Sequence, residues 1–132
     1  MKPESAHLLD AARELLNEAH SIQAINLHGQ AGRTAYSAAL LAARAFVYER
    51  PGRVVKTHRG SHNAFFKLTS GEPRIEEDLR RFLARAYELK DVVDYGVGPG
   101  RNVTASQART TLETATHFVA RIAEILDTPV PS

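Results

Sequence analysis

Hydrophobic residues recur every three or four positions along most of the chain, which is the period of a helix with one buried face. Near the amino terminus, Leu8, Ala12, Leu15 and Ala19 form such a stripe. The same spacing predicts four more helices, from about Gly32 to Glu49, Thr57 or Ser61 to Thr69, Pro73 to Asp94, and Thr104 to Asp127. No segment alternates with period two over a useful length, so no sheet is expected. We therefore predict an all-α protein, an antiparallel four-helix bundle with one additional short helix.

Residues that start or stop helices flank these segments. The stretch from His28 to Gly32 interrupts the apolar pattern after the first helix, and Pro51-Gly52 follows the second. Thr104 and Gln107 have the spacing of a capping box at the start of the last helix. Two oppositely charged pairs with i,i+4 spacing are expected on the outer face of the fourth helix: Glu76 with Arg80 and Glu77 with Arg81. These signals predict helices joined by rather short loops.

The composition describes one ordinary globular domain. The chain has 132 residues, 43% of them hydrophobic, and no cysteine. A single domain over residues 1–132 is expected, and it can bury enough surface to fold without disulfides or a structural metal. No apolar run approaches the ~20 residues that cross a bilayer. Glu4, Asp10 and Glu14 lie where an export signal would be apolar, so a cytoplasmic protein without a membrane segment is expected.

The net charge is only +2, so any binding to nucleic acid must come from a local basic patch. The segment RPGRVVKTHRGSH, from Arg50 to His62, provides one, because it contains four basic residues, two histidines and no acid. Its Arg53, Lys56 and Arg59, together with Arg33 of the second helix, are the candidates for binding a phosphate of RNA or of a nucleotide. The alternative is that this basic turn only caps the third helix and stays in water.

His58 and His62 are four residues apart, which places both on one face of a helix. Two such histidines can bind a metal, but no acid at ligand spacing accompanies them, so neither a metal nor another cofactor is expected. Metal-independent cleavage of RNA needs a base for the 2′-hydroxyl proton, an acid for the leaving oxygen and a cation for the developing charge. His58, His62 and Arg59 are therefore the candidate catalytic residues.

Arg33 and Tyr36 lie at the start of an alanine-rich helix whose small side chains bury well. A guanidinium and a phenol in such a place need polar partners. Asp94, at the end of the fourth helix, suits Arg33 because a bundle brings helix ends together. We predict a buried polar network of Arg33, Tyr36 and Asp94, whose disruption would cost several kcal/mol.

Three segments in this order resemble the HEPN domain family of small prokaryotic proteins: GRTAYSAALLAARAF, KTHRGSHNAFFKL and RFLARAYELKDVVDYG. The family has S-R-A-Y-Y-A-x-x-H-A-A-R-A on its second helix, a K-x-H-[KR]-G turn before its third, and R-x-x-A-D-Y at the end of its fourth. The resemblance covers about residues 5 to 126. It implies a bundle of four or five helices, usually a homodimer, and often a small nucleotidyltransferase as the partner in a toxin and antitoxin pair.

The chain departs from the family at the catalytic motif. Catalytic members carry R-x(4-6)-H, commonly continued as H-x-Y, but Val93 stands where that histidine belongs. Leu41 likewise replaces the histidine of the second-helix motif. The usual ribonuclease centre is therefore missing. Tyr95 matches the tyrosine to which the partner of related toxins attaches AMP, so the resemblance implies a candidate modification site there.

Two hypotheses of different classes follow from these observations. The first is a HEPN-fold component of a toxin and antitoxin system that binds RNA or a nucleotide, and whose ribonuclease activity would rest on residues other than the usual motif. The second is a non-catalytic interaction module that pairs with a small nucleotidyltransferase. The missing histidine favours the module, and growth arrest on expressing the protein alone would favour the toxin.

Overall fold

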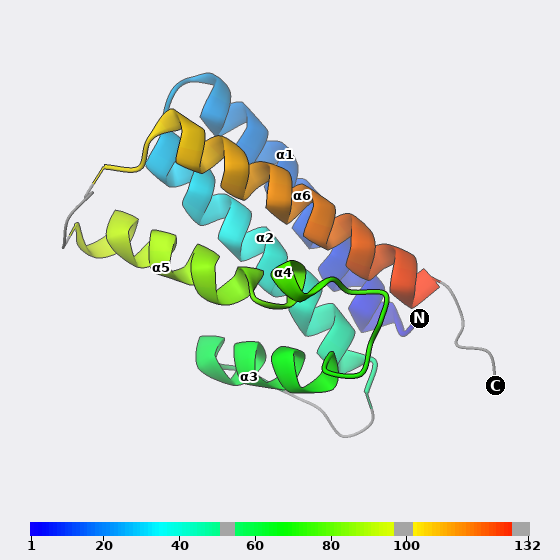
Figure 1. The fold of residues 1–132 in the computed structure, drawn as a ribbon. Coiled ribbons are helices and arrows are strands. Elements are labelled where there is room, and N and C mark those ends of the chain that lie inside the picture. Colours follow the sequence, from blue (N-terminus) through cyan, green and yellow to red (C-terminus); the bar gives the residue numbers. More distant parts are fainter. Residues whose placement is uncertain (51–54, 97–101, 128–132) are drawn as a thin grey trace.

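The computed structural model describes residues 1–50, 55–96 and 102–127, and within these ranges it contains helices and no strand. The helices are α1 (Pro3–Ala24), α2 (His28–Tyr48), α3 (His58–Leu68), α4 (Glu77–Arg80), α5 (Phe82–Tyr95) and α6 (Ala105–Asp127) (Figure 1). The all-α prediction is confirmed. Two features named in the sequence analysis lie outside the described residues: the helix stop at Pro51-Gly52 and the candidate phosphate-binding Arg53.

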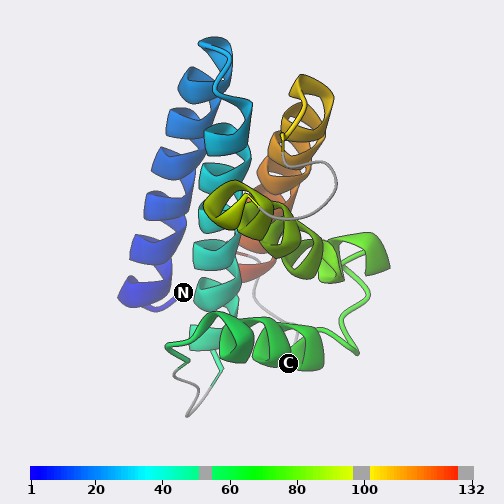
Figure 2. The ribbon, with the colours of Figure 1, turned by 90° about the vertical axis from the view of Figure 1, so that its left-hand side faces the viewer.

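The second helix, α2, is the centre of the protein. α1, α3, α5 and α6 all pack against it, with α1 and α5 on different sides (Figure 2). Its sequence explains this position, because seven of its alanines are completely buried: Ala31, Ala35, Ala38, Ala39, Ala42, Ala43 and Ala45. Such small side chains let neighbouring helices approach closely on several sides at once.

The connection between α1 and α2 is shorter than the sequence pattern predicts. α2 begins at His28, and the prediction of a break from His28 to Gly32 is wrong. Asn26 makes the turn in the left-handed conformation, with φ of 65°, which asparagine tolerates better than most residues. Gly32 serves packing within the helix, because a Cβ there would lie 2.6 Å from Cδ2 of Leu89 on α5.

The predicted fourth helix is two helices. The chain from Pro73 to Ile75 forms turns, and α4 and α5 are separated at Arg81, which has φ of −91° and ψ of −6°. The turn before α4 is held by a bidentate ion pair, in which Arg74 donates Nε at 2.7 Å and Nη2 at 2.9 Å to the carboxylate of Glu72. The apolar stripe is continuous across the break, so hydrophobic spacing alone does not detect it.

One of the two predicted ion pairs on this segment is present. Arg81 donates to Glu77 at 3.0 Å, as predicted. The pairing of Glu76 with Arg80 is wrong, because Arg80 binds Glu77 at 2.7 Å and Glu76 instead binds Arg121 at 3.0 Å. Glu76 precedes α4 in extended conformation, so its side chain reaches α6 and ties this segment to the last helix.

Four phenylalanines join the helices through a chain of ring contacts. Phe46 of α2 contacts Phe65 of α3 at 5.6 Å between ring centroids, and Phe65 contacts Phe118 of α6 at 5.3 Å. Phe118 in turn contacts Phe82 at the start of α5, at 5.8 Å. Edge-on and tilted ring pairs at such distances are favourable beyond the area they bury. This chain fixes α3 and the start of α5 against the rest of the protein.

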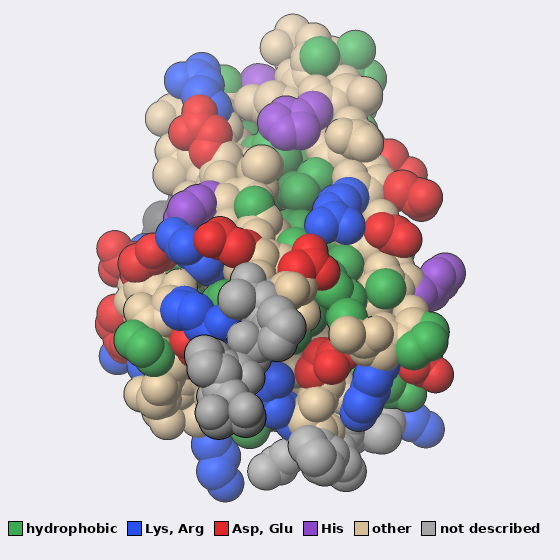
Figure 3. All heavy atoms as spheres, turned by 90° about the vertical axis from the view of Figure 1, so that its right-hand side faces the viewer, with side chains coloured by type: hydrophobic (Ala, Val, Ile, Leu, Met, Phe, Trp, Pro, Cys, Tyr) green, Lys and Arg blue, Asp and Glu red, His purple; other side chains and the backbone are tan. Residues whose placement is uncertain are grey.

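One face of the protein is mixed in charge. On this face, drawn in Figure 3, acidic and basic side chains are interspersed, with hydrophobic side chains between them. In the part of the chain that the structure describes, no helix has the length and apolar character needed to cross a membrane.

Candidate functional site

The hydroxyl of Tyr36 lies between two histidines. Its Oη is 2.7 Å from Nδ1 of His58 and 2.9 Å from Nε2 of His62, and Tyr36 itself is fully buried. The predicted sharing of one helix face by His58 and His62 is therefore present. Their common partner is a phenol from α2, which the sequence analysis placed elsewhere.

The start of α3 explains why the histidines face α2. Thr57 caps the helix, because its Oγ1 accepts a hydrogen bond from the backbone N–H of Gly60 at 2.9 Å. A Cβ at residue 60 would lie 2.7 Å from both Oγ1 of Thr57 and Cγ1 of Val55, so the cap needs a glycine there. His58 then occupies the first helical position, and His62 lies one turn further along the same face.

Arg44 joins α2 to the first turn of α3. Its Nε donates to Oγ of Ser61 at 3.1 Å, and its Nη2 donates to the carbonyl of Lys56 at 3.4 Å. Ser61 is fully buried and donates in turn to the carbonyl of Thr57 at 2.8 Å. A guanidinium thus holds the start of α3 in place and puts a fixed positive charge beside the histidines.

Tyr87 of α5 completes a cluster of four rings. Its ring centroid lies 5.5 Å from that of Tyr36, 5.6 Å from that of His58 and 5.4 Å from that of His62. The rings of Tyr36 and His58 are stacked, 13° from parallel. We call Tyr36, His58, His62 and Tyr87 the aromatic cluster. Three helices contribute to it, so it forms only when α3 and α5 are both docked on α2.

The surroundings keep the three hydrogen-bonded residues Tyr36, His58 and His62 neutral near pH 7. Burial raises the pKa of the Tyr36 hydroxyl, and nearby Tyr87 raises it further. Burial also lowers the pKa of His62, with added repulsion from His58 and Arg44. The pKa of His58 is lowered by burial and then by the charges of Arg44 and Lys90, against a smaller opposing effect of Asp91. A neutral imidazole has one ring nitrogen free to accept a proton.

A groove between α3 and α5 opens beside the cluster. Two adjacent cavities of about 350 Å³ each share His62, Asn63 and Ala84 in their linings. One is also lined by Arg59, Tyr87 and Glu88. The other extends toward Phe66, Arg80, Arg81, Leu83 and Arg85. We call the two together the α3–α5 groove. Of the two histidines, only His62 is part of its lining.

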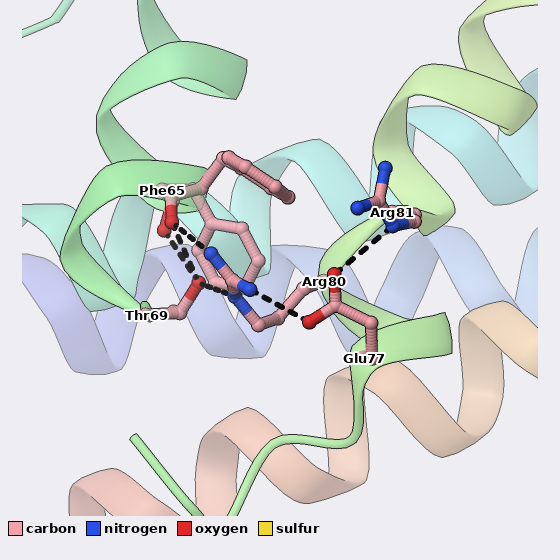
Figure 4. Close-up of polar contacts among 6 residues, drawn as sticks. Phe65, Thr69, Glu77, Arg80 and Arg81 are labelled. Carbon is pink, nitrogen blue, oxygen red and sulfur yellow. Dashed lines mark hydrogen bonds and ion pairs between the residues drawn. The ribbon is translucent and has the colours of Figure 1, made fainter. Parts of the chain in front are cut away.

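Arg80 fixes the far end of this groove (Figure 4). Its Nε donates to Oγ1 of Thr69 at 2.9 Å and its Nη2 to the carbonyl of Phe66 at 2.7 Å, both at the end of α3. Its Nη1 donates to Glu77 of α4 at 2.7 Å, and its guanidinium lies 4.1 Å from the ring centroid of Phe66. Arg80 is thus occupied by structural contacts, and Arg81 shares the single carboxylate of Glu77 with it.

Arg59 and Arg85 are the cations that the groove offers to a ligand. Among the described residues, neither forms an ion pair with a carboxylate, and Arg85 uses one nitrogen to bind the carbonyl of Asp78 at 2.9 Å. Both are exposed. Lys56, the other described member of the predicted basic turn, is exposed just before α3. Arg85 was not predicted from the sequence. Tyr87, on the same helix, was not predicted either.

The predicted network of Arg33, Tyr36 and Asp94 is only partly assembled. Arg33 binds Asp94 at 3.1 Å, and Lys90 binds the other oxygen of Asp94 at 2.5 Å. Lys90 holds the pKa of Asp94 below its usual value, with a smaller contribution from Arg33. Tyr36 does not take part, because its hydroxyl is bonded to the histidines. The Arg33 side chain is 50% exposed, so the pair lies near the surface and is not the buried network predicted.

Tyr95 ends α5 in an open position. Its side chain is 70% exposed, and Gly96 follows it in the left-handed conformation, with φ of 60°. Among all the residues that the structure describes, no group of three or more histidines and carboxylates is arranged to hold a metal ion. Comparison of the sequence with models of protein families, and with curated proteins, gives no match.

Proposed function

We propose that this protein binds the phosphates of single-stranded RNA or of a nucleotide in the α3–α5 groove, as a HEPN-fold component of a toxin and antitoxin system. The observation that carries the proposal is the groove lining, in which the neutral His62 is shared by two adjacent cavities, one lined by Arg59 and the other by Arg85. Free guanidinium groups bind phosphate oxygens well, and the part of the Phe66 ring that stays exposed beside Arg80 and Arg81 offers a stacking surface for a base.

The arrangement of the three family-like segments supports the HEPN part of the proposal. Tyr36 comes from the first segment, His58 from the second and Tyr87 from the third, and their rings are in mutual contact. Arg33 of the first segment also binds Asp94 of the third. Residues of the three segments therefore lie close together, as expected if the segments serve one function. In this proposal α1, α2, α5 and α6 correspond to the four-helix bundle, with α3 and α4 as short additions.

The test is binding to a fluorescent single-stranded RNA whose 2′ positions are methylated, so that binding is measured without cleavage. A few phosphate contacts predict a dissociation constant of roughly 10⁻⁴ to 10⁻⁶ M at physiological salt. Arg59→Ala and Arg85→Ala should each reduce the slope of log affinity against log salt by about 0.7, the value of one contact on a single strand.

Arg109→Ala is the matched control, because Arg109 is exposed on α6 and lines neither cavity of the groove. It removes the same charge and should leave the salt slope unchanged. Binding that is undetectable at low salt, or an equal effect of all three substitutions, would refute the proposed site.

A second candidate function is pairing with a nucleotidyltransferase as a non-catalytic module. The 70% exposure of Tyr95 favours it, because an enzyme that attaches AMP needs an accessible phenol. Co-expression with a small nucleotidyltransferase, followed by mass spectrometry, tests the idea, with Tyr95→Phe as the control. A stable complex or an adduct on Tyr95 would support the module. The homodimer that the resemblance implies is tested separately by light scattering.

A further inference from the structure

The position of the Tyr36 hydroxyl between two histidines restricts where their protons can be. A phenol has one proton, so it donates to one imidazole nitrogen and accepts from the other. When Oη donates to Nε2 of His62, Nδ1 of His58 carries a hydrogen. When Oη donates to Nδ1 of His58, Nε2 of His62 carries the hydrogen instead. The two neutral histidines therefore have coupled tautomers.

This coupling changes the chemistry that His62 presents to the groove. Its Nε2 is occupied by Tyr36, so Nδ1 is the ring nitrogen left for a ligand. In the first state Nδ1 carries a hydrogen and can donate a proton. In the second state Nδ1 is bare and can accept one. To pass from the first state to the second, Oη gives its proton to Nε2 of His62 and takes the Nδ1 proton of His58, while Nδ1 of His62 loses a proton to solvent and Nε2 of His58 gains one from it. His62 is thereby converted from an acid into a base, and the net charge of the site is unchanged.

We propose that His62, Tyr36 and His58 form a proton relay for metal-independent cleavage of RNA bound in the α3–α5 groove. This inference rests on the proposed function. His62 is the catalytic residue, while Tyr36 and His58 are positioning residues that set its protonation. The exposed His58, whose Nε2 is not engaged by Tyr36, connects the relay to solvent.

The reaction starts with Nδ1 of His62 bare. The 2′-oxygen of the ribose attacks the adjacent phosphorus and its proton passes to Nδ1 of His62. The proton on Nε2 passes to Oη of Tyr36, and the phenolic proton passes to Nδ1 of His58, which releases its Nε2 proton to solvent. The bond from phosphorus to the 5′-oxygen breaks, and that oxygen takes a proton from water, whose hydroxide is neutralised by the proton His58 released. The products are a 2′,3′-cyclic phosphate and a 5′-hydroxyl end.

Arg59 supplies the positive charge that this step requires. It lines the same cavity as His62 and is not neutralised by a carboxylate among the described residues. The other charges near the relay are Arg44 on α2, Lys90 and Asp91 on α5, and Glu88 of α5, which lines the same cavity as His62. With Arg59, three cations face two acids, and burial acts in the same direction as the cations, which favours neutral histidines and hence a base ready at neutral pH.

The experiment measures cleavage of a 5′-labelled single-stranded RNA in the presence of EDTA, from pH 5 to 9, alongside binding to the 2′-methylated RNA. The wild type should leave 2′,3′-cyclic phosphate ends and should not cleave DNA. His62→Gln, which keeps a hydrogen-bonding group near Tyr36, should lower the rate at least about 100-fold, since general acid and base groups contribute about 10² to 10⁴. His7→Gln, at an exposed position on α1, is the control and should match the wild type.

Two further variants separate a relay from a structural role. Tyr36→Phe keeps the ring and removes the proton path. His58→Asn keeps a donor near Oη but cannot pass a proton. Each should lower cleavage at least about 10-fold and leave binding of the 2′-methylated RNA within about 2-fold. In both variants, a plot of cleavage rate against pH should lack the change in slope that titration of His58 causes in the wild type. Cleavage at the wild-type rate in Tyr36→Phe would overturn the relay.

The wild type alone provides a measurement that is independent of activity and of variant folding. Nitrogen-15 NMR of the histidine rings should find Nδ1 of His58 and Nε2 of His62 with complementary protonation, the gain at one matching the loss at the other. Protonated fractions at the two nitrogens that do not sum to one, such as full protonation of both, would overturn the coupling. A wild type that binds the 2′-methylated RNA but cleaves no RNA at any pH would overturn the relay and leave the proposed binding intact. Loss of binding itself would instead refute the proposed function.

Discussion

The two sides of α2 are built in different ways. Toward α1 and α6, where its contacts in the described structure are most extensive, α2 packs mainly through small apolar side chains. Toward α3 and α5 it presents Arg33, Tyr36 and Arg44, each bonded to a polar group on another segment. One helix can thus form part of the tightly packed core on one side and position polar side chains on the other. The close packing of the first side holds the polar groups of the second in register.

The largest difference between the sides should appear on truncating matched leucines. Leu9 of α1 is 1% exposed, whereas Leu89 of α5 is only partly buried. Leu9→Ala should lower the free energy of unfolding by about 2–5 kcal/mol, the usual cost of a leucine-sized cavity in a core. Leu89→Ala should cost less than half as much. Urea unfolding measures both, and equal costs would contradict the proposed difference between the two sides.

A tight contact between α2 and α5 allows a sharper test of the polar side. Gly32→Ala should cost about 1–3 kcal/mol, because its Cβ would lie 2.6 Å from Cδ2 of Leu89, so that either this side chain or α5 must shift. In a Leu89→Ala background the added methyl has room, so the same change should be neutral or stabilising. A double-mutant cycle by urea unfolding measures this coupling. Additive effects would mean that the Leu89 side chain moves aside without cost.

The histidines make the polar side sensitive to pH. Both His58 and His62 have a pKa below the ordinary value of 6.5, so the folded protein binds fewer protons than the unfolded chain as pH falls below that value. The free energy of unfolding should therefore decrease as pH falls from about 6.5 toward the lowered values, and recover above it. Thermal unfolding from pH 5 to 8 measures the effect. His62→Gln should flatten the curve, whereas His7→Gln should leave it unchanged.

The smallest effect is expected at the surface ion pair. Arg33→Ala should cost less than about 1 kcal/mol, because half-exposed pairs are well screened and Asp94 keeps Lys90 as a partner. The buried network predicted from the sequence would have cost several kcal/mol at this position. If Arg33→Ala lowered the melting temperature as much as Leu9→Ala does, the result would support a buried network after all.

The sequence predicts the elements of this fold better than their boundaries. Apolar spacing locates the helical segments because buried faces repeat every turn. It cannot detect the break at Arg81, since Leu79, Phe82 and Leu83 keep the stripe intact while the backbone turns. It also misreads Gly29 and Gly32 as a break, because the packing of Val93 and Leu89 against them involves a helix far along the chain.

The site was predictable in its parts but not in its connections. The spacing of His58 and His62 correctly places both on one helix face, and Arg33 was correctly paired with Asp94. Tyr36 was assigned to the wrong partners. Arg33 faces the end of α5, but Tyr36, one turn further along α2, has its hydroxyl facing α3. Tyr87 and Arg85 were missed, although a tyrosine two turns before Asp94 on the same helix was a usable signal.

The short turn at Asn26 also bears on the order in which the chain folds. Because only three residues separate α1 from α2, their contacts are local in sequence and are formed at a small cost in chain entropy. We therefore expect this hairpin to form first and α5, α6 and α3 to dock onto it. The aromatic cluster joins residues as much as 51 positions apart, from Tyr36 to Tyr87, so we expect it to form late. Backbone amides of α3 should accordingly exchange with solvent sooner than those of α2, through opening of α3 alone.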